Sequence, residues 1–289
     1  RKSFFKYVSP GTAKAVLENS TLRWSSPTLF NDPFDVPREI SFGITPENIM
    51  HALSLRMIEL IESPPNDTSN LNPGVRLIIE TVKNGVPEEL KKELIEGIKD
   101  VENEHQPRND SLDELHAMWR AFIPDFRILC LAESPAHSAM WSHYAEQYSG
   151  SVLEFRCVDE LDSAWFAAKP VRYPKSKPEV YTAAGWAKIL TMPNEKAIRA
   201  IVDIATFTKS QDWSYEKEWR ITSFKRPNDI GHFTDYKFHS DELVAVYLGP
   251  MVPTSDREIL IKLSENYQKV VVRDVLIGLD REFLFKKQG

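Results

Sequence analysis

Most of the short motifs that mark common enzyme classes are missing from this chain of 289 residues. It has no P-loop, no GxGxxG dinucleotide motif, no HExxH zinc motif and no GxSxG nucleophile elbow. Cysteine is scarce as well, because Cys130 and Cys157 are the only two, and no Cys/His cluster has the spacing of a zinc site. These absences point away from the enzyme classes that those motifs define.

The chain also lacks an apolar run of membrane length, a signal-peptide pattern, internal repeats and low-complexity segments. We therefore expect a cytoplasmic protein, in which the two cysteines are buried thiols rather than a disulfide. Apolar residues make up 42% of the chain and charged residues 27%, which is typical of a soluble protein. A net charge of −6 argues against a protein coated in basic surface, although a local basic groove remains compatible with it.

Strand and helix patterns occur without strict alternation, which predicts the α+β class. Helical spacing dominates residues 44–121, and we expect one α+β domain over residues 1–289 that carries this stretch as a helical insertion or subdomain. Helices are also predicted at 13–19, 139–147, 183–209 (interrupted near 192–193) and 254–268. Strands are predicted at 4–8, 21–25, 126–131, 152–155, 170–173, 218–224, 233–238, 243–248, 270–272 and 275–277.

The most informative stretch holds two carboxylates, Glu216 and Glu218, where an apolar strand begins. Residues i and i+2 of a strand point to the same face, so we expect the two side chains to repel each other and the pKa of one to rise. A site for a sugar hydroxyl, a cation or a metal can use such a pair. The alternative is a surface ladder in which Arg220 neutralises Glu218 in a plain salt bridge.

Two other segments are candidate parts of a site. The loop that contains Asn31, Asp32 and Asp35 is either ordinary turn chemistry or a rigid loop that presents a carboxylate to a ligand. Further along, Trp141 and Tyr144 share one helical face, as core side chains usually do. His143 points elsewhere and is either a solvated or capping histidine or a base that contacts a ligand.

These pieces together resemble the bacterial domain of unknown function 2971 family. The resemblance covers most of the chain outside the helical insertion. The matching segments are 5–7, 22–27, 30–35, 128–131, 140–145, 150–155, 213–220 and 246–249.

More distantly, the layout resembles the ADP-ribosyltransferases, which place a catalytic Glu-x-Glu motif at the start of a late strand. That resemblance implies a mainly antiparallel split sheet and NAD as the substrate. Glu218 would hold the nicotinamide-side ribose and stabilise an oxocarbenium-like transition state, Glu216 would orient or deprotonate the acceptor, and Tyr7 would be the third catalytic residue. Lys6 and Tyr7 stand where those enzymes usually carry an Arg or His. The residues implied in NAD binding are Lys6, Trp24, Ser25, Ser26, Asn31, Asp32, Asp35, Trp141, His143, Tyr144 and Arg220, of which Trp24, Trp141 or Tyr144 would stack on nicotinamide.

Three functions follow as hypotheses. The first is an enzyme that transfers ADP-ribose from NAD to water or to a protein or nucleic acid, in phage defence or as a toxin. For it, we expect Glu218→Gln to stop nicotinamide release with little change in melting temperature. The second is a nuclease with Mg²⁺ held among carboxylates, for which the candidates are Asp32, Asp35, Glu154, Glu216 and Glu218. The third is a non-enzymatic sensor or interaction module that docks through residues 44–121.

Overall fold

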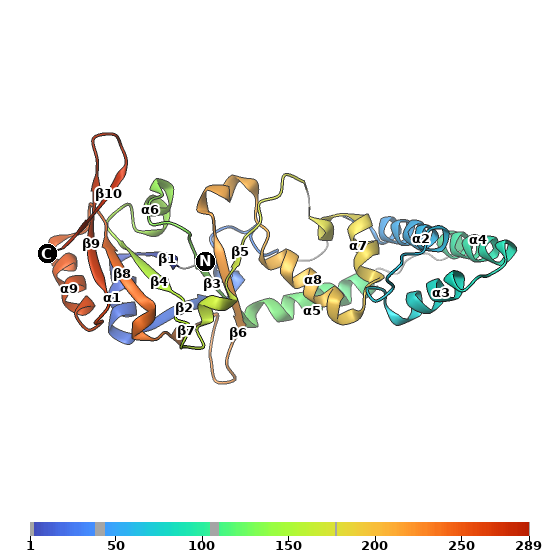
Figure 1. Ribbon diagram of the computed structural model, residues 1–289, viewed down its shortest axis with the longest axis horizontal. Coiled ribbons are helices and arrows are strands. Elements are labelled where there is room, and N and C mark those ends of the chain that lie inside the picture. The colour runs from blue at the N-terminus through green and yellow to red at the C-terminus, as the bar shows by residue number, and fades with distance from the viewer. Residues whose placement is uncertain (1–2, 38–43, 105–109, 177, 289) are drawn as a thin grey trace. The chain divides into compact units, whose positions relative to one another are not determined.

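The computed structural model describes residues 3–37, 44–104, 110–176 and 178–288. The chain divides into two compact units, each built from segments that are distant in the sequence. The sheet unit contains Arg1–Asp32, Ile123–Tyr173 and Lys209–Gly289, and the helical unit contains Pro33–Phe122 and Pro174–Thr208 (Figure 1).

The sheet unit holds two five-stranded sheets, with the strand orders β1-β4-β8-β9-β10 and β5-β6-β3-β2-β7. Neighbouring strands are antiparallel except β8 and β9, which are parallel. The chain is thus a mixed α+β protein, as its sequence predicts. The strands are β1 (Ser3–Val8), β2 (Thr21–Ser25), β3 (Phe126–Leu131), β4 (Ser151–Arg156), β5 (Lys169–Pro170), β6 (Trp219–Phe224), β7 (Phe233–Lys237), β8 (Leu243–Leu248), β9 (Val271–Ile277) and β10 (Phe283–Lys287).

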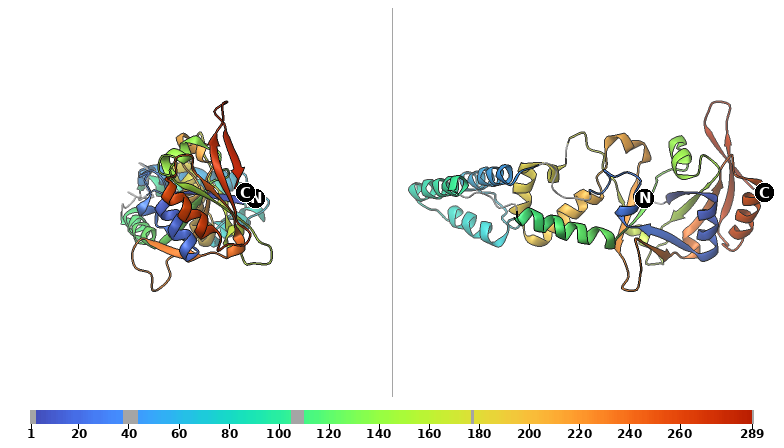
Figure 2. Two further views of the ribbon diagram at one scale, coloured as in Figure 1. Left: turned by 90° about the vertical axis from the view of Figure 1, so that its left-hand side faces the viewer. Right: turned by 180° about the vertical axis from the view of Figure 1, so that it is seen from behind.

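Alternation along β1 shows how the first sheet is buried on both faces. Phe4 and Val8 belong to one apolar cluster with helices α1 (Pro10–Asn19) and α9 (Thr254–Ser264), which lie side by side (Figure 2). Phe5 and Tyr7 face the other way, into a cluster with Trp141 of helix α6 (Ser138–Tyr144). A period of two therefore gives each face of the strand its own apolar layer.

The two sheets are linked where β1 passes the end of β3. Phe5 and Ala132 exchange two backbone hydrogen bonds, of 3.0 and 2.7 Å, in an isolated antiparallel bridge. Lys6, the next residue, lies opposite the end of β3, and its Nζ donates to the carbonyl of Cys130 at 2.8 Å. The middle of β1 thereby meets β3, the neighbour of β6 in the second sheet, and β6 is the strand that follows the two carboxylates.

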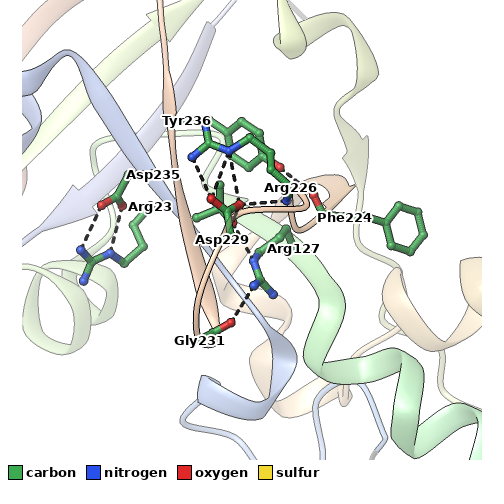
Figure 3. Close-up of polar contacts among 9 residues, drawn as sticks. Arg23, Arg127, Phe224, Arg226, Asp229, Gly231, Asp235 and Tyr236 are labelled. Atoms are coloured by element: carbon green, nitrogen blue, oxygen red, sulfur yellow. Dashed lines mark hydrogen bonds and ion pairs between the residues drawn. The ribbon is translucent and has the colours of Figure 1, made fainter.

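A fully buried arginine ties the loop between β6 and β7 to the middle of the second sheet (Figure 3). The Arg127 guanidinium donates to the Gly231 carbonyl at 2.8 Å and to the Thr234 hydroxyl at 2.9 Å. That hydroxyl donates to Asp229 at 2.6 Å, and Asp229 also pairs with Arg226 at 3.1 Å. These bonds fix the edge strand β7, although its neighbour in sequence, β6, lies three positions away in the sheet.

The helical unit packs its own core. Leu60, Ile61 and Ile79 form an apolar cluster between helices, and the Trp119 indole donates to the Pro37 carbonyl at 2.6 Å. Its helices are α2 (Pro46–Glu62), α3 (Pro73–Lys83), α4 (Glu88–Glu104), α5 (Asp110–Phe122), α7 (Ala183–Leu190) and α8 (Asn194–Thr206). The predicted insertion, residues 44–121, falls inside this unit, but α7 and α8, which we did not expect there, complete it.

The observed elements differ from the predicted ones at a few places. The strand predicted at 170–173 is only the two-residue β5, and the two short strands predicted after 270 are the single strand β9. The final strand, β10, was missed altogether. Helix α6 ends at Tyr144 rather than near residue 147, because the next turn is left-handed.

That left-handed turn consists of Glu146, Gln147 and Tyr148, at φ values of 46°, 52° and 71°. Left-handed backbone is unfavourable for residues with a side chain, so other contacts must hold the turn. Gly150 and Gly249 supply these contacts, because without a Cβ they can lie very close to neighbouring backbone carbonyl groups. A Cβ on Gly150 would lie 2.2 Å from the carbonyl oxygen of residue 8, and a Cβ on Gly249 would lie 2.2 Å from that of residue 148.

Gly150→Ala is therefore expected to lower the free energy of unfolding by about 1–3 kcal/mol or more, because the methyl group meets backbone that cannot move aside. Urea titration followed by circular dichroism measures the change. Gly11→Ala is the matched control, since nothing lies within 4 Å of its added Cβ. Equal urea midpoints for the two variants would contradict the close approach.

Candidate functional site

The two carboxylates come together through a turn rather than along a strand. Glu216 is the last residue of the short 3₁₀ helix Gln211–Glu216, and Glu218 immediately precedes β6. Lys217 between them is left-handed, with φ 43° and ψ 52°. The expectation that both lie on one strand face was therefore wrong for Glu216. Both are nonetheless buried, at 4% and 6% exposure, so they are not an open surface ladder.

A buried lysine bridges the pair. The Lys209 Nζ donates to Glu216 Oε2 at 2.6 Å and lies 3.4 Å from Glu218 Oε2. Its side chain is only 4% exposed, and its backbone N–H donates to the Arg172 carbonyl at 3.0 Å. One cation thus lies between two carboxylates that would otherwise repel each other in a medium of low dielectric constant.

Glu218 is held by a second cation. Arg220 donates from Nε at 2.8 Å and from Nη2 at 2.9 Å to the two oxygens of that carboxylate, and its side chain is fully buried. The salt bridge that we considered as an alternative is present, but in the interior instead of on the surface. Burial acts to raise the pKa of Glu218, but the Arg220 charge and hydrogen bonds, with Lys209 and the Cys130 thiol, outweigh it and lower the pKa to about 2.

Glu216 is shifted in the opposite direction. Burial raises its pKa, since the charge of Lys209 compensates only in part and the negative Glu218 adds to the rise. The Tyr144 hydroxyl donates to Glu216 Oε1 at 2.7 Å, and the Asn31 side chain bonds to that same hydroxyl. Burial and the bond to Glu216 raise the pKa of Tyr144 as well, so the phenol remains a donor at neutral pH.

Partly exposed rings border this ion cluster. Lys209 Nζ lies 4.6 Å from the ring centroid of Trp213, and Trp213 is 6.0 Å from Tyr215. Tyr215 stacks on His137 at 5.4 Å and its hydroxyl is 3.3 Å from His143 Nδ1. His143 is exposed, which fits the solvated histidine that we considered.

Several predicted residues lie beside the carboxylates. Arg220 binds Glu218 and Tyr144 binds Glu216, whereas Asn31 binds only the Tyr144 hydroxyl. Lys6 contacts the carboxylates only through another residue. Its Nζ donates to the carbonyl of Cys130, and the thiol of Cys130 is hydrogen-bonded to Glu218. The Tyr173 hydroxyl, which we did not predict, accepts a hydrogen bond from the Glu218 N–H at 3.0 Å.

Other predicted residues have structural tasks elsewhere. The Tyr7 hydroxyl donates to the Ser134 carbonyl at 2.8 Å, and the Tyr7 ring packs edge-on against the Trp141 ring. Trp141 is fully buried, as expected for a core side chain on that helical face. Its ring therefore has no free face for nicotinamide. Trp24 packs on Tyr236 with ring centroids 4.9 Å apart.

The predicted serines and the aspartates divide between the two units. Ser25 is the last residue of β2, and Ser26 is fully buried, with its hydroxyl donating to the Ile123 carbonyl at 2.9 Å. Asp32 is buried at the end of the first segment of the sheet unit. Asp35 belongs to the helical unit, where its charge adds to burial in raising the pKa of Tyr181.

Sequence reasoning missed Lys209, Tyr173 and Trp213. Only Trp213 had a signal, since it stands in the same segment as the carboxylates. Within the described ranges, no group of three or more His, Cys, Asp or Glu side chains is placed to hold a metal ion. None of the described helices is both long and apolar enough to cross a membrane.

Comparison with known proteins adds one match. No curated protein and no solved structure matches the chain significantly. Residues 140–221, which run from α6 into β6 and include both carboxylates, Lys209 and Arg220, match the family model described as "Protein of unknown function (DUF2971)".

Proposed function

We propose that the protein cleaves the glycosidic bond of NAD at the Glu216–Glu218 pair and transfers ADP-ribose to water or to a macromolecular acceptor. The observation that carries this proposal is the opposite shift of two adjacent carboxylates, because the pKa of Glu216 is raised and that of Glu218 is lowered to about 2. Pairs whose environments separate their pKa values in this way divide the acid–base and charge-stabilising roles between them.

The roles follow from these charges. The bond between nicotinamide nitrogen and ribose C1′ breaks, its electron pair moves to the ring, and positive charge develops on the ribose. Glu218 stays ionised and stabilises that charge electrostatically, while Arg220 fixes the carboxylate. Glu216 takes the proton of the acceptor hydroxyl as its oxygen bonds to C1′, for which a raised pKa is suited.

The surroundings support this assignment. Tyr144 and Lys209 hold the two Glu216 oxygens at 2.7 and 2.6 Å, which orients the carboxylate. Trp213 and Tyr215, rather than the buried Trp141, offer partly exposed rings on which nicotinamide can stack. Two mainly antiparallel sheets joined at a single described bridge also agree with the split sheet of the ADP-ribosyltransferase-like fold.

The other two hypotheses have less support. A magnesium-dependent nuclease needs a carboxylate cluster, and the described residues provide no group of three metal-binding side chains. A sensor that docks through the helical unit is compatible with its separate core but explains nothing about the buried ion cluster.

The proposal is tested by incubating the purified chain with NAD and measuring released nicotinamide by liquid chromatography. We expect release that grows with time and protein concentration. A cell lysate with NAD labelled in its adenylate part then distinguishes transfer to a macromolecule from hydrolysis. If no nicotinamide forms with either water or lysate as acceptor, the proposed activity is wrong.

A further inference from the structure

The last strand of the first sheet, β10, is an edge of that sheet. It pairs with β9 on one side, and among the described residues no strand lies on its other side. The opposite edge, β1, is linked to the second sheet, because Phe5 exchanges two backbone hydrogen bonds with Ala132. An edge strand presents backbone donors and acceptors with which another strand can pair. β10 is therefore where this sheet can be extended.

The β9–β10 hairpin also extends past the strand next to it (Figure 1). β8 pairs with β9 only as far as Asp274, and beyond that point residues 275–277 pair with residues 283–285. A two-stranded ribbon is only marginally stable in water by itself. This one carries large apolar side chains that are 44–103% exposed, namely Leu276, Ile277, Leu279 and Leu284. A further strand beside β10 would cover part of this apolar surface.

Hydrogen bonds at the two ends of β10 show which of its backbone groups face outward. The Glu282 carbonyl accepts from the Gly278 N–H at 2.9 Å, and the Gln288 N–H donates to the Val272 carbonyl at 3.1 Å. Along an antiparallel strand, residues alternate between bonding to that neighbour and facing away from it. The even-numbered residues of β10 therefore bond to β9. The outward-facing N–H and C=O groups are those of Phe283, Phe285 and Lys287.

These outward groups allow β10 to pair with β10 of a second copy around a twofold axis at Leu284. In that antiparallel register, Phe283 of each copy exchanges backbone hydrogen bonds with Phe285 of the other. The two Leu284 side chains lie opposite each other, in the kind of pair that brings side chains closest. Glu282 lies opposite Lys286 twice in the dimer, so opposite charges face each other. The strand is thus complementary to itself in backbone hydrogen bonding, apolar surface and charge.

Neighbouring registers lack this match. A twofold axis at Phe285 would set Lys286 opposite Leu284 and would pair no opposite charges within the strand, and an axis at Lys286 would set the two lysines against each other. A lysine on an edge strand usually keeps other strands from pairing with it. Only a register that gives Lys286 a carboxylate removes that obstacle, which favours the axis at Leu284.

We propose that this edge is a dimer interface, in which the β10 strands of two copies pair antiparallel about Leu284 and join the two first sheets into one. β10 has only five residues, so we expect a weak dimer that dissociates on dilution. The inference goes beyond NAD cleavage and does not depend on it, because Glu216 and Glu218 lie outside this hairpin.

Sedimentation velocity of the full chain between about 1 and 200 μM, a range in which a weak dimer dissociates, tests the proposal. We expect the average sedimentation coefficient to rise with concentration. Glu282→Lys and Lys286→Glu each place two like-charge pairs in the dimer, and each should raise its Kd about tenfold or more. An equal mixture of the two variants should associate about as tightly as the parent, since each supplies the charge that the other then needs.

The mixture also separates the interface from damage to the hairpin. Lys286 lies opposite Asp274 in β9, so Lys286→Glu adds repulsion within one chain, and recovery in the mixture shows that the loss came from the interface. Lys237→Glu is the matched control, because it makes the same charge change at an exposed position of β7, an edge of the second sheet. It should leave the dimer unchanged.

Three results would overturn the proposal. The first is a parent that stays monomeric over the whole concentration range. The second is a parent dimer whose Kd does not rise in Glu282→Lys and Lys286→Glu, or rises equally in Lys237→Glu. The third is an equal mixture of the two β10 variants that associates no better than either variant alone.

Discussion

Glu216→Gln is expected to lower the rate of nicotinamide release by about 10²–10⁴-fold, the usual contribution of a positioned acid or base. Glutamine keeps the size of the side chain and can still accept from Tyr144 at one oxygen, but it cannot take a proton from the acceptor. Burial raises the pKa of Glu216, so removing its charge relieves a desolvation cost while it weakens the pairing of Lys209. We therefore expect the free energy of unfolding to fall, but by less than in Glu218→Gln, because Lys209 still lies 3.4 Å from Glu218.

The pH profile provides a second readout of the same variant. As a base, Glu216 must be ionised, so the parent should lose activity as pH falls through a pKa above that of an ordinary glutamate. The residual activity of Glu216→Gln should lack that acidic limb. Glu133→Gln is the matched control, because Glu133 pairs with the neighbouring Lys217 at 3.3 Å but at a partly exposed position. Nicotinamide release at the parental rate in Glu216→Gln would remove this residue from the mechanism.

Glu218→Gln is expected to lower the free energy of unfolding by about 3–5 kcal/mol, the typical result of removing one partner of a buried ion pair. The cost arises because the Arg220 guanidinium stays fully buried without its two charge-assisted hydrogen bonds. This replaces the expectation from sequence that the melting temperature would hardly change. Loss of activity in Glu218→Gln alone thus cannot be separated from damage to the fold, and Glu216 is the better probe of catalysis.

The pH dependence of stability has a definite sign for this residue. The folded pKa of Glu218 is about 2, below the ordinary 4.5, so its contribution is complete above the ordinary value. That contribution is lost as pH falls from about 4.5 towards 2. Urea titrations across this interval should show a steeper loss of stability in the parent than in Glu218→Gln.

A double variant tests the physical reason for the cost. Glu218→Leu combined with Arg220→Met removes both charges and keeps similar volume, so we expect it to recover much of the stability that Glu218→Gln loses. Glu133→Gln again controls for the loss of a carboxylate and should change stability by less than about 1 kcal/mol. If Glu218→Gln unfolds at the same urea concentration as the parent, Glu218 and Arg220 do not form a buried pair in solution.

Local patterns predicted much of the sheet unit. The period-two apolar residues of β1 and the apolar run of β6 were assigned correctly within a residue or two. The short helix between β1 and β2 was also found, although it begins at Pro10, after the Ser9 cap, rather than at residue 13. These elements were predictable because neighbouring side chains decide them. The final strand β10 was missed, since the pattern of Phe283–Lys287 makes sense only once β9 lies beside it.

The candidate site was predictable only in part, because local patterns do not show which distant residues the fold brings together. Glu216, Glu218 and Arg220 are close in sequence, so a short motif pointed to them. The left-handed Lys217 that separates the carboxylates was not predictable, because a lysine rarely adopts that conformation without outside support. Lys209 was not predictable as a partner either, since it follows a helix of the other unit and is brought to the carboxylates by the fold.

The sequence by itself determined the α+β class, most strand and helix positions and the presence of an acidic motif at the start of β6, because these depend on spacing and local backbone preferences. The tertiary structure decided which charges share the interior. The pKa values of the two carboxylates moved in opposite directions only when Lys209, Arg220 and Tyr144 were packed around them. Burial strengthens each of these interactions, and burial is a property of the folded chain rather than of any short segment.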